Sequence, residues 1–109
     1  MLPKKERLSR QAFSRFFSVG RKIHTPLFQV VYSPHPTLHV SVVVSKKISK
    51  RAVGRNKIRR RVYDAVRRYR TESGLTGVYI FIMKTGVEVV TYENLKKEIY
   101  TTITKILST

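Results

Sequence analysis

The sequence predicts an α+β fold, in which helices pack on one mixed β-sheet within a single domain spanning residues 1–109. The chain has 109 residues and no cysteine, a length that supports one hydrophobic core without disulfides. Its apolar residues recur at spacings that give the order helix, strand, strand, helix, strand, helix. No internal repeat or linker divides it. The continuously apolar run from Val78 to Met83 predicts a buried central strand in this sheet.

The first helix is expected from about Arg10 to Ser18, with Ser9 as its N-cap and Gly20 just past its end. One face carries three aromatic rings, those of Phe13, Phe16 and Phe17. Such a stripe on a short helix normally packs into a core. Aromatic rings beside positive charge also suit the stacking of unpaired bases. The sequence leaves both roles open.

Two strands follow, from Leu27 to Ser33 and from Leu38 to Ser45. Both are rich in β-branched residues, and the segment PHPT at 34–37 breaks the run between them. We expect the two strands to pair antiparallel in the sheet.

A basic loop from Lys46 to Gly54 leads into an amphipathic helix from about Arg55 to Arg70. The residues expected to face the core are Ile58, Val62, Ala65, Val66 and Tyr69. The remaining surface is almost entirely cationic, through Arg59, Arg60, Arg61, Arg67 and Arg68. This helix is the expected crossover between the second and third strands.

The last third of the chain begins with a turn marked by Gly74 and Gly77, which precedes the Val78 strand. Thr91 is positioned to cap a final helix from about Tyr92 to Leu107. Its inward positions are Leu95, Ile99, Ile103 and Ile106.

The charge of the chain points to a polyanionic partner. Lys and Arg total 23 against 6 acidic residues, a formal charge of +17 with a sequence pI near 10.9. About half of the cations lie between Lys46 and Arg70, opposed only by Asp64. A nucleic-acid phosphate backbone neutralises such density best. A membrane is the weaker partner because the chain has no long apolar run.

Catalytic and metal-binding patterns are poorly supported. The absence of cysteine excludes thiol catalysis and Cys-based zinc sites, and fits a reducing cytosol. The acids are scattered, and His24, His35 and His39 lack metal-ligand spacing. The basic N-terminus has no following apolar segment or cleavage site, so we expect a cytoplasmic protein with no secretory signal. We therefore expect a binding protein that has no catalytic residues, no metal ligands and no small-molecule substrate.

One motif is familiar. The segment from Val44 to Ile48 (VSKKI), followed by Arg51 to Arg60 (RAVGRNKIRR), closely resembles the "RNR" signature of the bacterial ribonuclease P protein subunit. The resemblance covers nearly the whole chain, extending through Arg7, Leu8, Phe13, Phe17, Gly20, Thr91 and Leu95.

The resemblance implies a protein that binds a large catalytic RNA and helps it remove the 5′ leader from precursor tRNA. The implied partners are therefore that RNA subunit and precursor tRNA, and the implied cofactor is Mg²⁺ held mainly by the RNA. It also implies the ribosomal protein S5 domain 2-like fold, an α/β sandwich with a left-handed β-α-β crossover. The general handedness rule predicts the opposite hand.

Carried over by position, the signature and its neighbouring cations predict RNA contacts at Lys46, Lys47, Arg51, Arg55, Asn56, Lys57, Arg59, Arg60, Arg61 and Arg67. Asn56, at the expected helix start, could instead cap the helix. The cleft for the single-stranded leader is predicted from Phe13, Phe17 and Val31.

This chain departs from the family pattern at two positions. The strand aromatic of the family's cleft aligns with Val31 and not with the neighbouring Tyr32. Tyr63 stands where the family commonly has a basic residue, and Arg61 or Arg67 could compensate.

Two other function classes compete with this interpretation. A basic structural RNA-binding protein of the ribosomal type would have the same size and charge. A self-sufficient nuclease would need the acid and metal-ligand clusters that the sequence lacks. The RNR signature beside aromatic residues favours the ribonuclease P subunit over both.

Overall fold

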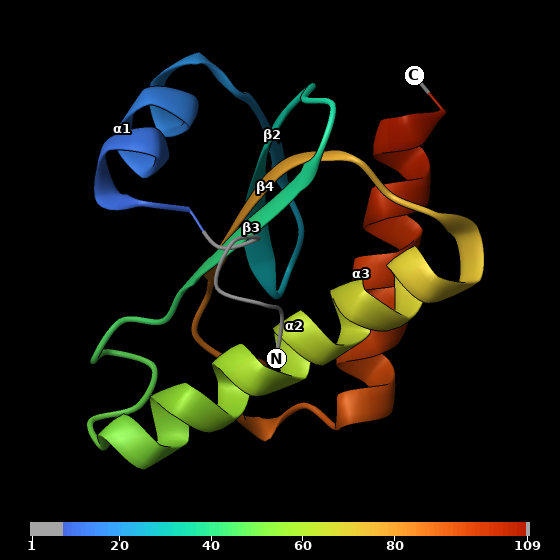
Figure 1. Ribbon diagram of the computed structural model, residues 1–109. Coiled ribbons are helices and arrows are strands. Elements are labelled where there is room, and N and C mark those ends of the chain that lie inside the picture. The colour runs from blue at the N-terminus through green and yellow to red at the C-terminus, as the bar shows by residue number, and fades with distance from the viewer. Residues whose placement is uncertain (1–7, 109) are drawn as a thin grey trace.

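A mixed four-stranded sheet forms the centre of the molecule (Figure 1). The computed structural model describes residues 8–108, so Arg7 of the resemblance lies outside the described residues. The strands are β1 (Arg21–His24), β2 (Phe28–Ser33), β3 (Leu38–Val43) and β4 (Gly77–Met83), and their order in the sheet is β1-β2-β4-β3. Strand β2 pairs antiparallel with both β1 and β4, whereas β3 and β4 are parallel.

The expected antiparallel pairing of β2 with β3 is wrong, because β4 lies between them. Strand β4 is buried along almost its whole length, and a strand that is apolar on both faces is stable only in the interior of a sheet. Its predicted central position is thus confirmed, and it displaces β2 from β3. Strand β1 was not expected. It has four residues, of which only Ile23 is half-buried, too few for a recognisable periodicity.

In the described part of the chain, three α-helices cover the faces of the sheet: α1 (Arg10–Val19), α2 (Ala52–Ser73) and α3 (Tyr92–Leu107). A short 3-10 helix, η2, spans Val87–Val89. Both predicted N-caps are confirmed. The Ser9 hydroxyl accepts a hydrogen bond from the backbone N–H of Ala12, and the Thr91 hydroxyl accepts one from the backbone N–H of Asn94, each at 3.2 Å. Helix α2 is the predicted crossover between β3 and β4, and it begins earlier than expected, directly after Arg51.

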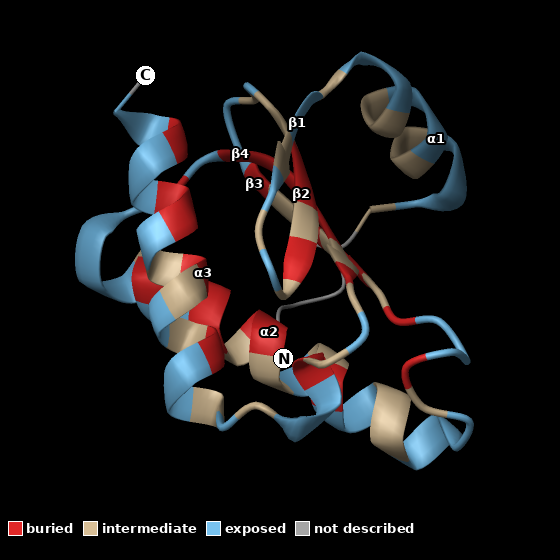
Figure 2. Ribbon diagram, turned by 180° about the vertical axis from the view of Figure 1, so that it is seen from behind, coloured by how far each residue is buried: buried red, intermediate tan, exposed pale blue. Residues whose placement is uncertain are grey.

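The two faces of the sheet are covered very differently. Helices α2 and α3 pack on one face and enclose the main core, which includes every inward residue predicted for them. Among residues 8–108, α1 is the one helix on the opposite face, where it packs over a small cluster of Val31, Val78 and Ile80. Figure 2 shows buried stripes along α2 and α3, whereas α1 has no buried residue. The second face therefore leaves half-buried side chains at the surface.

Candidate RNA interface

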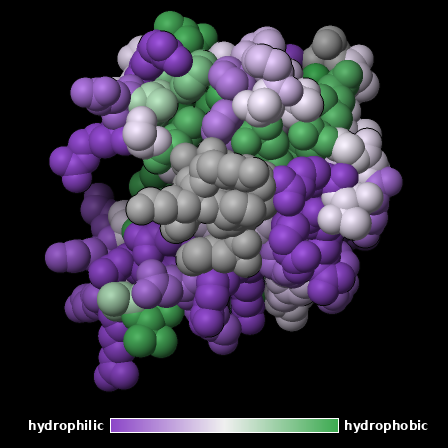
Figure 3. Space-filling model, in the orientation of Figure 1, coloured by the Kyte–Doolittle hydropathy of each residue, from purple (hydrophilic) through white to green (hydrophobic). Residues whose placement is uncertain are grey.

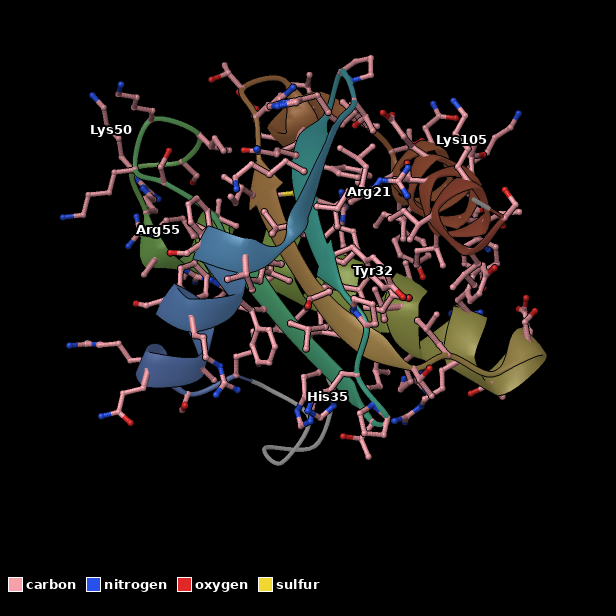
Figure 4. The ribbon with its side chains drawn as sticks, turned by 90° about the horizontal axis from the view of Figure 1, so that it is seen from above. Arg21, Tyr32, His35, Lys50, Arg55 and Lys105 are labelled. Atoms are coloured by element: carbon pink, nitrogen blue, oxygen red, sulfur yellow. The ribbon has the colours of Figure 1, made fainter. Side chains whose placement is uncertain are left out.

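The loop before α2 is held against the start of that helix by two features. A Cβ on Gly54 would lie 2.2 Å from the Ser49 hydroxyl oxygen and 3.2 Å from the Ser49 Cβ, so a larger residue here would require the Ser49 side chain to shift. The Arg55 guanidinium donates hydrogen bonds to the carbonyls of Ser49 at 3.0 Å and Lys50 at 2.8 Å (Figure 4). Arg55 is a predicted RNA contact, and its Nη1 donates both of these hydrogen bonds to the loop that carries Lys46, Lys47 and Lys50.

Asn56 and Arg59 engage each other. The Arg59 Nη1 donates to the Asn56 side-chain oxygen at 2.8 Å. Because α2 begins at Ala52, Asn56 lies in its second turn, and the alternative role of Asn56 as the helix cap is wrong. Its side chain instead orients a neighbouring guanidinium on the exposed surface.

Arg61 is tied to the η2–α3 connection. Its Nη1 donates to the Val90 carbonyl at 3.3 Å, a contact between residues far apart in the sequence. This hydrogen bond joins the middle of α2 to the segment that precedes the Thr91 cap.

Asp64 offsets part of the charge in the C-terminal part of the cationic face. Its carboxylate forms salt bridges with Arg67 at 2.8 Å and Arg68 at 3.0 Å. It also accepts a short hydrogen bond from the Tyr92 hydroxyl of α3. The Tyr92 bond, followed by the two arginines, lowers the pKa of Asp64 to about 2. Burial, together with the same bond, raises the pKa of Tyr92 to about 12.

Six cations on the loop and the first half of α2 have no such partner among the described residues. Within residues 8–108, no side-chain hydrogen bond or ion pair engages Lys46, Lys47, Lys50, Arg51, Lys57 or Arg60. All of them are exposed. They lie on the loop and the first half of α2, where Figure 3 shows hydrophilic side chains gathered. We call these six residues the free cation patch.

Two members of the free cation patch border a hollow. Lys57 and Arg60 line an open pocket of about 390 Å³ together with Arg61, Asp64 and Tyr92. The cationic face of α2 is thus most available to a ligand over its first half, because the single carboxylate of Asp64 offsets part of the charge of Arg67 and Arg68.

On the other face, α1 presents a row of half-buried phenylalanines. The rings of Phe13 and Phe17 stack with centroids 5.8 Å apart. The ammonium of Lys22 lies over the Phe17 ring at 5.3 Å, and the guanidinium of Arg15 over the Phe16 ring at 4.7 Å. Aromatic surface and positive charge therefore meet on α1, the combination that suits single-stranded nucleic acid.

Val31 joins Phe13 and Phe17 in one cluster, yet it lies beneath them. It is 1% exposed, so this predicted cleft residue packs under α1 and offers no surface for stacking. A Cβ on Gly20 would lie 2.4 Å from a methyl group of Val31, which shows how closely the end of α1 approaches β2. Tyr32 lies on the opposite face, against Tyr79 at 5.1 Å (Figure 4).

Tyr63 occupies the position where a basic residue was expected from the family pattern. It is 6% exposed and belongs to the main core. Its ring therefore contributes packing between α2 and the rest of the core. The nearby Arg61 and Arg67 are each engaged within the chain, by Val90 and Asp64 respectively.

Sequence reasoning missed one aromatic contact. His35, in the turn after β2, lies edge-on to Phe16 with centroids 6.0 Å apart and edge-on to His39 at 4.9 Å. The spacing in PHPTLH gave no metal-ligand pattern, and the contact with α1 is long-range. Among residues 8–108, no three His, Asp or Glu side chains come close enough together to hold a metal ion. None of the helices described is both long and apolar enough to cross a membrane.

The fold and its cations define a small, strongly basic α+β protein with a charged helix crossing between parallel strands. The chain belongs to the ribonuclease P protein family, whose sequence profile matches residues 2–107. It is 28% identical over 109 residues to the ribonuclease P protein component of Rickettsia canadensis, covering 89% of this chain and 92% of that one. The corresponding protein of Synechococcus elongatus is 36% identical over 76 residues, 63% of this chain and 62% of the relative.

Solved structures share the fold. A Staphylococcus aureus RNase P protein mutant with defective mRNA degradation activity superposes with a TM-score of 0.80 at 24% identity, covering 96% of this chain and 90% of that one. The RNase P protein from Thermotoga maritima gives 0.78 at 21% identity, with 88% and 93% covered. These likenesses confirm the predicted α+β architecture.

Proposed function

We propose that the chain is the protein subunit of an RNA-based endoribonuclease. In this role it binds a catalytic RNA and the 5′ leader of precursor tRNA, and so promotes removal of the leader to make the mature 5′ end. Family membership supports the assignment. The observation that carries it is the separation of the free cation patch, on the loop and the first half of α2, from a half-buried aromatic row on α1.

The two surfaces have different chemistry and suit different parts of an RNA assembly. The free cation patch would contact phosphates of the catalytic RNA, because exposed Lys and Arg side chains release counterions when they meet a phosphate backbone. Arg55 would act there mainly by holding the loop in place through its two carbonyl contacts. The rings of Phe13 and Phe17 would stack on unpaired bases of the leader.

The catalytic chemistry would belong to the RNA. Phosphodiester hydrolysis needs an activated water and charge stabilisation at the leaving oxygen, which Mg²⁺ commonly supplies. Phosphate oxygens of the RNA would hold that Mg²⁺. The protein's cations would reduce the repulsion between the RNA and its substrate, which lowers the Mg²⁺ concentration needed for binding. We propose that this activity takes place in the cytoplasm.

The test combines the purified chain, the ribonuclease P RNA of the same source and a precursor tRNA. Protein alone should cleave nothing, RNA alone should cleave at high Mg²⁺, and added protein should shift cleavage to lower Mg²⁺. A structural RNA-binding protein of the ribosomal type would bind RNA without this shift. Cleavage by the RNA-free protein, abolished by changing one acid or histidine, would overturn the proposal.

A pair of matched variants locates the RNA contact. Lys57→Ala with Arg60→Ala removes two unpaired cations, so the slope of log affinity against log salt should fall by about one per lost phosphate contact. Arg67→Ala with Arg68→Ala removes the same charge from residues already paired with Asp64, and should change the slope less. Equal changes in the two double variants would show that the free cation patch has no special role.

A further inference from the structure

A second run of rings continues from α1 onto the sheet. The ring of His35 contacts Phe16 on one side and His39 on the other. Both contacts are edge-on, with an interplanar angle of 86°. The three residues come from α1, from the turn after β2 and from β3. All three are half-buried, so each keeps exposed surface.

The backbone register places His39 on the same face of the sheet as α1. His39 is the partner of Val78 in the parallel β3–β4 ladder, and paired residues direct their side chains to the same face. Val78 lies in the small cluster under α1. The residues that flank His39, Leu38 and Val40, point into the main core instead.

Thr37 fixes both imidazoles. The His35 Nδ1 lies 3.2 Å from the Thr37 backbone nitrogen, which donates to it, and 3.2 Å from the Thr37 hydroxyl. The His39 Nε2 lies 2.8 Å from the same hydroxyl. The Thr37 carbonyl is also 3.2 Å from the His35 Nδ1. Neither the His35 Nε2 nor the His39 Nδ1 has a hydrogen-bond partner among residues 8–108.

We propose that His35 and His39 bind an unpaired nucleotide of the leader, as an extension of the aromatic surface of α1. This inference rests on the proposed function and names a further part of its substrate site. It also accounts for Val31, since the strand beneath α1 provides an aliphatic side chain that is 1% exposed. The accessible rings on this face come instead from His35, in the turn after β2, and from His39 on β3.

The chemistry of imidazole suits this ligand. A histidine ring stacks on a base, and its free ring nitrogen hydrogen-bonds a base edge or a phosphate oxygen. Because Thr37 holds both rings in place, little side-chain freedom remains to be lost on binding. The Arg15 guanidinium over the Phe16 ring adds a positive charge at the α1 end of the row.

The experiment measures the affinity of the reconstituted holoenzyme for precursor tRNA, with His35→Ala and His39→Ala combined. We expect affinity for the precursor to fall about fivefold or more, because each stacked base contributes substantially to binding. Affinity for mature tRNA, and for a precursor whose leader is cut to one nucleotide, should stay unchanged. His24→Ala is the matched control, since His24 is an exposed histidine on β1 whose only ring contact among residues 8–108 is with Gln29.

A photo-crosslinking measurement on the unmodified protein guards against a variant that fails to fold. Thiouridine placed in the leader should crosslink to the peptide that contains residues 34–39. The inference applies where the unmodified holoenzyme prefers precursor over mature tRNA. In that case it is overturned if the double variant binds the precursor as tightly as His24→Ala does and no crosslink forms to this peptide. If the unmodified holoenzyme shows no such preference, the proposed function itself fails.

Discussion

Two pairs of aromatic rings, one on each face of the sheet, show how differently this chain uses the same side chain. Phe28 and Phe81 lie 5.5 Å apart between the sheet and its two large helices, and both are fully buried. Phe13 and Phe17 lie 5.8 Å apart on α1, and both remain half-buried. The separations are similar, and the exposure differs because one helix cannot cover a face that two helices cover.

The comparison assigns different tasks to the faces. Burial of apolar area on the α2–α3 face provides most of the stabilisation of the fold. The α1 face buries only three residues of the sheet completely and keeps its rings accessible. A binding surface needs such accessible apolar area beside charge, whereas a core cannot provide it.

The largest expected effect separates the faces by stability. Phe81→Ala should lower the free energy of unfolding by about 3 to 5 kcal/mol, because it removes a fully buried ring and leaves a cavity. Phe17→Ala should cost clearly less, since the ring is already partly in water. Urea unfolding followed by circular dichroism measures both. Equal losses would place Phe17 in the core and end the distinction.

The next effect appears in binding. Phe17→Ala should weaken the binding of precursor tRNA to the holoenzyme by about 1 to 3 kcal/mol, the usual range for one stacked base. Binding of mature tRNA should change little, because it has no leader. A parallel titration of both RNAs measures the difference. The same loss for both would assign Phe17 to general affinity.

The two N-caps offer a finer test, because Ser9 and Thr91 cap α1 and α3 with the same 3.2 Å geometry. Thr91→Ala should lower global stability by about 1 kcal/mol. Ser9→Ala should affect mainly hydrogen exchange within α1, since a helix with no buried residue can open while the rest stays folded. Ser9→Asp and Thr91→Asp keep a capping oxygen and serve as controls. Identical global losses for the two alanine variants would contradict independent opening of α1.

The smallest expected effect is on the stability of the fold at acid pH. The pKa of Asp64 is about 2 in the folded protein against 3.8 ordinarily, so its contribution to stability is complete above about pH 4 and is lost as the pH falls through the folded value. Stability measurements should therefore show Asp64→Asn losing its difference from the unmodified chain as the pH approaches 2. The difference is small because the carboxylate is 30% exposed and partly screened.

Tyr92→Phe sharpens the acid test. It removes the hydrogen bond that lowers the pKa of Asp64 most, so the Asp64 pKa should rise toward its ordinary value while both arginine contacts remain. An NMR titration of the Asp64 carboxyl measures this directly. An unchanged pKa would show that the arginines, and not the link to α3, control it.

Local pattern was enough for much of the fold. Helix α3 spans the residues that its cap and periodicity predicted, and β4 is the buried central strand that its apolar run indicated. These features depend on residues close in sequence, which set capping, helical spacing and strand composition. The RNR signature likewise pointed to the family that the profile match identifies.

The sequence by itself determined composition, charge, caps and the faces of the helices. Only the tertiary structure decided that β4 separates β2 from β3, and that Val31 is covered by α1. It also decided that Asp64 and Val90 engage some arginines, while Lys57 and Arg60 have no side-chain partner among residues 8–108. The physical reason is that these features depend on contacts between residues that are far apart in the sequence. Strand pairing and the partners of a guanidinium depend on residues brought together by folding, and many partners are equally compatible with one local pattern.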